Sequence, residues 1–160
     1  MMTAAIITAS DKGYAGQRED LSGPAIQQML TGIAQIVSYK VLPDDRKMLA
    51  EEMVRLSDLS VNLVFTTGGT GLSPRDVTPE ATLDIAHRLV PGIAEAMRAK
   101  SLEKTPRAML SRATCATRDK TLIINLPGSP KACRECLEVV LPNLHHAVDI
   151  LTGVGGECAR

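Results

Sequence analysis

Aromatic residues are nearly missing from this sequence: its 160 residues include two Tyr, one Phe and no Trp. Proteins that bind single-stranded nucleic acids stack the bases on aromatic side chains, so this scarcity argues against such a platform. Excess charge is missing as well, because the formal net charge is zero, whereas general nucleic-acid and membrane-surface binders carry a basic excess. We therefore expect no nucleic-acid partner and a core built from aliphatic side chains.

Long hydrophobic runs are also absent. No stretch of about 18 apolar residues occurs, so we expect neither a membrane-spanning helix nor a membrane partner. The first residues, MMTAAIITASDKG, lack the basic start and the cleavage site of a signal peptide. We therefore expect a cytoplasmic protein, in which Cys115, Cys133, Cys136 and Cys158 remain reduced thiols.

What remains is the composition of an ordinary globular domain, with 44% apolar and 22% charged residues. The length fits a single domain over residues 1–160. A chain of about 150 residues buries roughly 68–70% of its unfolded surface, so it needs no disulfide or metal to fold.

The apolar segments alternate in type along the chain. Short runs rich in β-branched residues predict strands over residues 3–10, 35–42 and 61–67, and a hairpin within 113–126. Apolar residues at spacings of three or four predict helices over residues 22–30, 44–58, 78–89, 91–103 and 131–151. Asp20 or Ser22 and then Thr78 are the expected N-caps, and Pro142 is expected to kink the last helix. The alternation predicts a mostly parallel sheet with helices on both faces.

Four predicted strands end in polar or glycine-bearing segments. In open α/β sheets, ligands bind outside the carboxyl ends of the strands. The sequence therefore places its glycines and several acids where a ligand would lie. The four exits are Ser10-Asp11, Pro43-Asp44, Thr67-Gly68-Gly69-Thr70-Gly71 and Pro127-Gly128-Ser129.

The GGTG segment, Gly68–Gly71, favours an anion site. Glycine adopts positive φ and admits close approach, so the turn can present successive N–H groups to a phosphate. It is not a Walker A loop, because Leu72 stands where that motif needs Lys, and it does not match the GxGxxG fingerprint. A tight strand–helix connection without a ligand would use the same glycines, so that alternative stays open.

Asp44 and Asp76 are the candidate metal ligands. Mg²⁺ is typically held by one or two carboxylates together with substrate oxygens. Each aspartate also has a structural interpretation: Asp44 could cap the helix that follows it, and Asp76 could cap the turn through Ser73, Pro74 and Arg75.

The CREC segment, Cys133–Cys136, has the spacing of a redox or zinc motif. A zinc site needs a second pair at metal spacing, which Cys115 and Cys158 do not supply. Cys133 falls on the apolar stripe of its helix, so we interpret this cysteine as a core residue. His87 is interpreted as a surface residue, and no Ser/His/Asp arrangement is visible.

Four blocks of the sequence together resemble the molybdenum cofactor biosynthesis proteins of the MogA/MoaB type, a family that includes domains fused into gephyrin. The blocks occur in order and at family-like spacing, although Ser129 stands where the family often has Asn. They are TASDKGYAGQREDLSGPAI (8–26), VLPDD (41–45), TTGGTGLSPRDVTPEAT (66–82) and PRAMLSRATCATRDKTLIINLPGSPKA (106–132).

This resemblance implies a three-layer α/β/α sandwich with a mostly parallel central sheet, and it implies an enzyme. Family members transfer AMP from Mg-ATP to the terminal phosphate of molybdopterin and release pyrophosphate. The resemblance also implies a homotrimer, with molybdopterin and ATP as ligands, Mg²⁺ as cofactor and a molybdenum-insertion protein as a further partner.

The resemblance also assigns site residues. Asp44 and Asp76 would be catalytic and would hold Mg²⁺. The remaining assignments concern substrate and nucleotide binding. They are the N-terminal loop residues Ser10 and Asp11, the phosphate cradle Thr67, Gly68, Gly69, Thr70 and Gly71, the loop-shaping residues Thr78 and Glu80, the pterin contact Ser111, and the nucleotide wall Pro127, Gly128 and Ser129.

Two other functions stay open. One is a non-catalytic protein that binds or delivers molybdopterin, against which the presence of both Asp44 and Asp76 argues. The other is a nucleotide pyrophosphatase of the CinA type, which shares this fold, although SPRDVTPEAT suits the adenylyltransferase better. A purely structural interaction domain has no feature of the sequence in its favour.

Overall fold

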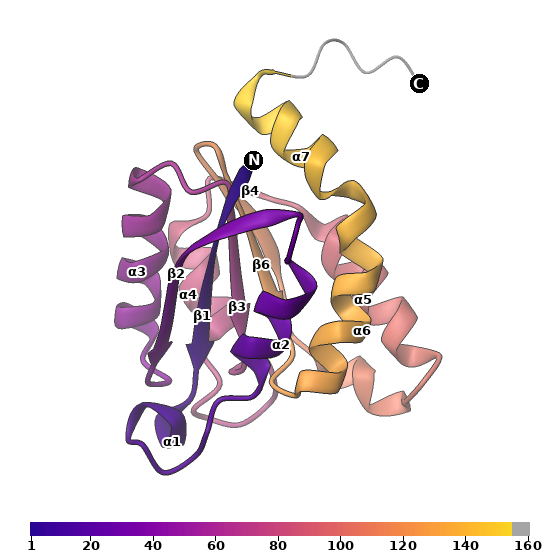
Figure 1. Ribbon diagram of the computed structural model, residues 1–160. Coiled ribbons are helices and arrows are strands. Elements are labelled where there is room, and N and C mark those ends of the chain that lie inside the picture. Colours follow the sequence, from indigo (N-terminus) through magenta and orange to yellow (C-terminus); the bar gives the residue numbers. More distant parts are fainter. Residues whose placement is uncertain (155–160) are drawn as a thin grey trace.

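The computed structural model describes residues 1–154, and within this part the strands form one sheet of order β2-β1-β3-β6-β5-β4 (Figure 1). The first four strands in this order, β2, β1, β3 and β6, run parallel to one another. Strand β5 pairs antiparallel with both β6 and β4. The strands are β1 (Met2–Ala9), β2 (Ala34–Leu42), β3 (Leu63–Thr67), β4 (Arg88–Leu89), β5 (Cys115–Arg118) and β6 (Thr121–Leu126).

Helices cover both faces of this sheet (Figure 1), which confirms the predicted three-layer α/β/α fold. One face carries α2 (Ser22–Met29), α5 (Pro91–Leu102), α6 (Pro130–Val140) and α7 (Leu144–Thr152). The other face carries α3 (Arg46–Asp58) and α4 (Thr78–Ile85). The short elements are α1 (Asp11–Tyr14), η1 (Pro106–Leu110) and η2 (Leu141–Asn143).

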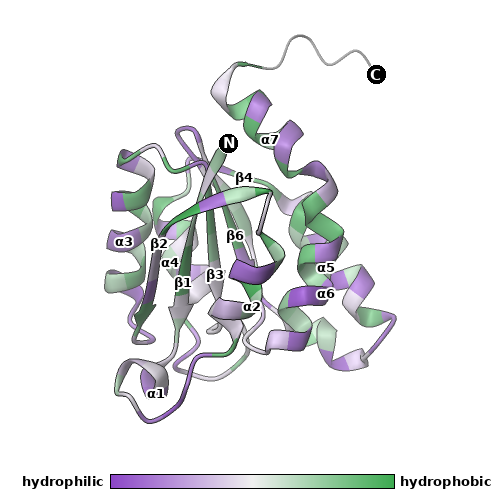
Figure 2. Cartoon of the chain, in the orientation of Figure 1, coloured by the Kyte–Doolittle hydropathy of each residue, from purple (hydrophilic) through white to green (hydrophobic). Residues whose placement is uncertain are grey.

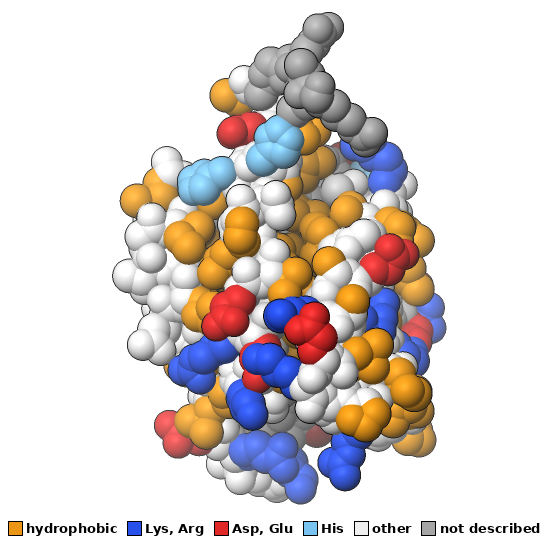
Figure 3. All heavy atoms as spheres, turned by 90° about the vertical axis from the view of Figure 1, so that its right-hand side faces the viewer, with side chains coloured by type: hydrophobic (Ala, Val, Ile, Leu, Met, Phe, Trp, Pro, Cys, Tyr) orange, Lys and Arg blue, Asp and Glu red, His pale blue; other side chains and the backbone are white. Residues whose placement is uncertain are grey.

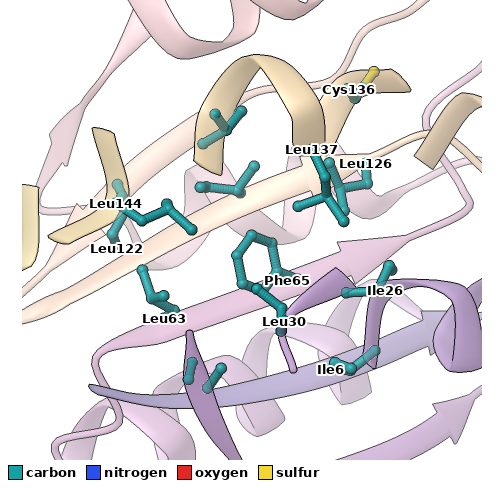
Figure 4. Packing of buried hydrophobic residues seen from close by; sticks show 14 of the residues in the cluster. Ile6, Ile26, Leu30, Leu63, Phe65, Leu122, Leu126, Cys136, Leu137 and Leu144 are labelled. Carbon is teal, nitrogen blue, oxygen red and sulfur yellow. The ribbon is translucent and has the colours of Figure 1, made fainter. Parts of the chain in front are cut away.

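The core follows from the alternation of side chains along the strands. Ala4 and Ile6 of β1 face the layer of α2, α5, α6 and α7, whereas Ala5 and Ile7 face α3 and α4. Figure 2 shows that the central strands are hydrophobic, as expected for parallel strands covered on both faces. Phe65 lies fully buried at the centre of the first layer, among aliphatic side chains (Figure 4).

Several local expectations need correction. The helix expected over residues 78–89 ends at Ile85, and the chain then forms the short strand β4. The short elements α1 and η1 were not among the predicted helices. The long C-terminal helix is interrupted at Pro142, as predicted, and becomes α6, η2 and α7. Within residues 1–154 no helix is both long and apolar enough to cross a membrane.

Candidate functional site

The four predicted strand exits lie at one edge of the sheet, because β2, β1, β3 and β6 are parallel. A cavity of about 510 Å³ opens there. Its lining includes eight of the residues expected at the site, as well as Thr8, Arg18 and Glu19, which were not assigned to it. The eight are Ser10, Asp44, Thr67, Gly68, Gly69, Asp76, Gly128 and Ser129.

A second cavity, of about 310 Å³, borders the same glycine loop. Thr70, Gly71, Ser111 and Pro127 line it, together with apolar side chains of α5 and η1. Asp11, Thr78 and Glu80 line neither of these two cavities. The glycine loop therefore separates two hollows, with its first half facing one and its second half facing the other.

The glycine loop requires glycine at its first two positions. Gly68 has φ +88° and Gly69 has φ +67°, a region that residues with a Cβ rarely adopt. The Gly68 amide donates to the carbonyl of Leu126 at 3.3 Å, so this one amide is already used. Within residues 1–154, the amides of Gly69, Thr70 and Gly71 make no hydrogen bond and remain available to an acceptor.

Asp44 is held at the cavity by Asp11. The Asp11 amide donates to Oδ2 of Asp44, and the Asp44 amide donates to Oδ1 of Asp11, both at 3.0 Å. Burial raises the pKa of Asp44, whereas the hydrogen bond that it accepts from the Asp11 amide lowers the pKa. The negative charges of Asp11 and Asp76 raise the pKa further. The expectation that Asp44 caps α3 is wrong, since Asp45 accepts the cap hydrogen bond from the Met48 amide at 2.8 Å.

Asp11 is occupied by protein contacts. Arg75 donates to both of its carboxylate oxygens, at 2.9 and 3.0 Å, and this pair lowers the pKa of Asp11. Asp11 therefore links the exits of β1 and β2 to the SPRD segment that contains Arg75. Its proposed contact with substrate remains a prediction.

Asp76 both caps its turn and lines the larger cavity. Its Oδ2 accepts a hydrogen bond from the Ser73 amide at 3.0 Å, so the structural interpretation of this aspartate is confirmed. A Cβ added at Gly71 would lie 2.8 Å from the same oxygen. Capping the turn and lining the cavity are compatible roles, because the turn that holds the Asp76 carboxylate also orients it toward the cavity.

Thr78 does not cap α4 through its side chain, contrary to the expectation. Its hydroxyl instead donates to the carbonyl of Gly68 at 2.9 Å, and its amide donates to the carbonyl of Gly69 at 3.1 Å. Glu80 pairs with Arg112. Thr78 therefore contacts the loop directly and Glu80 reaches it through Arg112, while their part in substrate binding remains a prediction.

Asp20 closes the N-terminal side of the cavity. The N-cap position of α2 is Leu21 rather than Asp20 or Ser22, but Oδ1 of Asp20 accepts from the amides of Ser22 and Gly23, the first two residues of the helix. Oδ2 of Asp20 accepts from the hydroxyls of Thr8 and Tyr39. Burial raises the pKa of Asp20, but these hydrogen bonds outweigh it and hold the pKa below its ordinary value. The loop is thereby anchored to both β1 and β2.

The described cysteines are free thiols in the core. Cys133 is fully buried and donates to the carbonyl of Pro127 at 2.9 Å, and burial raises the pKa of this thiol to about 11. Reactive cysteines have a lowered pKa, so the redox interpretation of CREC fails here. Within residues 1–154 no group of three or more His, Cys, Asp or Glu side chains could hold a metal ion. Cys158 lies outside the described residues.

Comparison with known proteins identifies the family of this chain. A family model described as a probable molybdopterin binding domain matches residues 5–146. The chain belongs to this molybdopterin binding family. The match spans every strand exit at the cavity, from Ser10 to Ser129.

This family member is similar to curated enzymes over most of its length. It is 43% identical over 152 residues to the molybdopterin adenylyltransferase of Helicobacter pylori, which covers 92% of this chain and 86% of that protein. It is 40% identical over 139 residues to the molybdopterin adenylyltransferase of Escherichia coli, covering 84% and 71% respectively. Among solved structures, the molybdopterin biosynthesis enzyme MoaB of Thermus thermophilus superposes with a TM-score of 0.91 at 47% identity, covering 96% of this chain and 98% of that one. The resemblance to proteins of the MogA/MoaB type is therefore confirmed.

Proposed function

We propose that this protein is a molybdopterin adenylyltransferase, which transfers AMP from Mg-ATP to the terminal phosphate of molybdopterin. A phosphate oxygen of molybdopterin attacks the α-phosphorus of ATP and forms a new P–O bond. The bond from the α-phosphorus to the bridging oxygen breaks, and pyrophosphate leaves with that oxygen. Because the attacking phosphate is already anionic, no side chain has to serve as a strong base, and catalysis rests on positioning and charge neutralisation.

The observation that carries this proposal is the pair of cavities on either side of the glycine loop. Adenylyl transfer joins a phosphate of one substrate to a phosphate of another, so it needs two adjoining sites with anion donors between them. We assign the larger cavity, walled by Ser10, Gly128 and Ser129, to the nucleotide. The smaller one, which Ser111 borders, would take the pterin.

Asp44 and Asp76 suit Mg²⁺ bound together with a nucleotide. Both line the larger cavity, and burial and mutual repulsion raise the pKa of Asp44. A cation between the two carboxylates would relieve that cost. Two carboxylates are too few for a cage of protein ligands alone, but Mg²⁺ commonly takes its other ligands from phosphates and water. When bound, Mg²⁺ would neutralise phosphate charge, while Asp44 and Asp76 would orient the triphosphate.

The alternatives receive less support. A protein that only binds or delivers molybdopterin does not need two carboxylates in the nucleotide cavity. No contact in the described residues favours a CinA-type pyrophosphatase, which would need a water nucleophile rather than a second substrate cavity.

The direct test mixes purified protein with molybdopterin, Mg²⁺ and ATP labelled at the α-phosphate. We expect the label to appear in adenylyl-molybdopterin, with one pyrophosphate released for each AMP transferred. Binding of molybdopterin without transfer would favour the delivery protein. Label released as free AMP, independently of molybdopterin, would favour the pyrophosphatase.

We further propose a homotrimer that works in the cytoplasm beside a molybdenum-insertion protein. Free thiols fit a reducing compartment. A mostly apolar groove of about 370 Å³ runs between α5 and α7, and hydrophobic side chains spread over this face (Figure 3). A second copy of the chain would cover it. Light scattering should return three times the chain mass of 17.1 kDa, and the monomer mass would contradict the trimer.

A further inference from the structure

Two residues hold all four backbone carbonyls of the loop Gly68–Gly71. Thr78 donates to the first two, from its hydroxyl at 2.9 Å and from its amide at 3.1 Å. Arg112 donates to the last two, from its amide at 2.8 Å and from Nε at 2.7 Å. All four donors belong to the protein, which itself sets the shape of the loop.

Fixing these carbonyls also fixes the amides. Peptide bonds are planar, and residues 1–154 contain no cis peptide, so each C=O points opposite to the N–H of the next residue. The N–H groups of residues 69–72 therefore point away from Thr78 and Arg112. Within residues 1–154 none of these four amides makes a hydrogen bond. These donors are arranged before any anion arrives, with Gly69 at the larger cavity and Thr70 and Gly71 at the smaller one.

The guanidinium of Arg112 extends this arrangement to Asp76. Its Nη2 donates to the Asp76 carbonyl at 2.7 Å, and its Nη1 donates to the Glu80 carboxylate. One side chain thus fixes the position of the glycine loop relative to the Asp76 backbone. Lysine cannot reproduce this, because its ammonium is a point charge without the planar fork of donors.

We propose that Arg112 is the positioning residue that makes the amides of residues 69–72 one set of anion donors fixed relative to Asp76, with Glu80 orienting its guanidinium. The proposal rests on the adenylyl transfer proposed above, in which this set of donors would hold the transferring phosphate. Arg112 acts through the loop and does not touch the substrate. The arginine lowers the pKa of Glu80, so the pair stays ionised near neutral pH.

The test compares Arg112→Lys with the parent by two measurements. Steady-state adenylyl transfer should show kcat lower by about 10- to 100-fold, the range for losing a partner that orients a first contact, with a smaller change in the KM for molybdopterin. Inorganic pyrophosphate should shift the amide signals of Gly69 and Gly71 in ¹⁵N NMR spectra of the parent at concentrations that leave Arg112→Lys unchanged. The NMR measurement does not depend on turnover.

Arg118→Lys is the matched control. Arg118 also donates from its guanidinium to a backbone carbonyl, that of Ile85, at the opposite end of α4. Arg118→Lys should lose comparable stability yet keep the parent kcat and the pyrophosphate response. Parent-like kcat and amide shifts in Arg112→Lys would overturn the proposal, and so would equal losses in both variants.

Two further variants keep the outcome decisive. If Arg112→Lys does not fold, Glu80→Gln gives the same test, because it keeps the guanidinium but removes the charge that orients it, and parent-like results would then overturn the proposal. Added ethylguanidinium should partly restore turnover in Arg112→Ala. A parent that binds pyrophosphate but transfers no AMP would contradict the adenylyl transfer and leave the NMR test of Arg112 intact.

Discussion

Replacing either Asp44 or Asp76 with asparagine is expected to lower AMP transfer by more than about 100-fold. Losing a residue that merely orients a metal ligand already costs about 10- to 100-fold, so losing the carboxylate itself should cost more. Both carboxylates line the cavity assigned to the nucleotide, so a nucleotide-bound Mg²⁺ would lose one of its ligands in either variant. Rates measured across a Mg²⁺ titration should show both variants requiring far more metal, or never reaching the parent rate.

The fold should survive these substitutions. Asparagine can still accept the hydrogen bond from the Asp11 amide to residue 44, and removing a charge whose pKa is raised by burial relieves a cost of folding. Asp45→Asn is the matched control, because asparagine caps a helix about as well as aspartate and residue 45 does not line the cavity. Parent-like transfer by Asp44→Asn and Asp76→Asn would contradict the metal assignment.

The sequence was enough to predict the layers and the edge that carries the site. Apolar runs such as residues 61–67 have a strong period or composition, and parallel strands bring their carboxyl ends to one edge whatever the details. For that reason Ser10, Asp44, Gly68 and Gly128 could be placed around one cavity without a structure.

The parts that could not be predicted depend on contacts between distant segments. Thr78 has the residue type of an N-cap, but its hydroxyl finds the Gly68 carbonyl, because that loop returns to the helix start. Arg112 contacts the carbonyl of Asp76, which lies 36 residues earlier in the sequence. No local sequence pattern indicates a contact over such a separation. The only signal for Arg112 was its place beside Ser111 in the MLSR segment. The strand β4 has two residues, too few for any period.

Gly68→Ala is expected to destabilise the protein more than any conformational effect alone would. Gly68 has φ +88°, which costs a residue with a Cβ about 1–2 kcal/mol. The added methyl would also collide with the backbone carbonyl of Ala9, the last residue of β1, and overpacking of this kind costs about 1–3 kcal/mol. The free energy of unfolding should therefore fall by about 2–5 kcal/mol, the sum of these two effects.

Gly16→Ala separates the two effects. Gly16 has φ +74°, and no heavy atom lies within 4 Å of a Cβ placed there, so only the conformational cost of about 1–2 kcal/mol applies. Urea unfolding of both variants should show the larger loss for Gly68→Ala. AMP transfer should fall only in Gly68→Ala, since a shifted Gly68 moves the amide of Gly69. Equal stability losses in the two variants would mean that the end of β1 moves to accommodate the methyl group. Gly68 would then be required for its backbone conformation rather than for the close contact between β3 and β1.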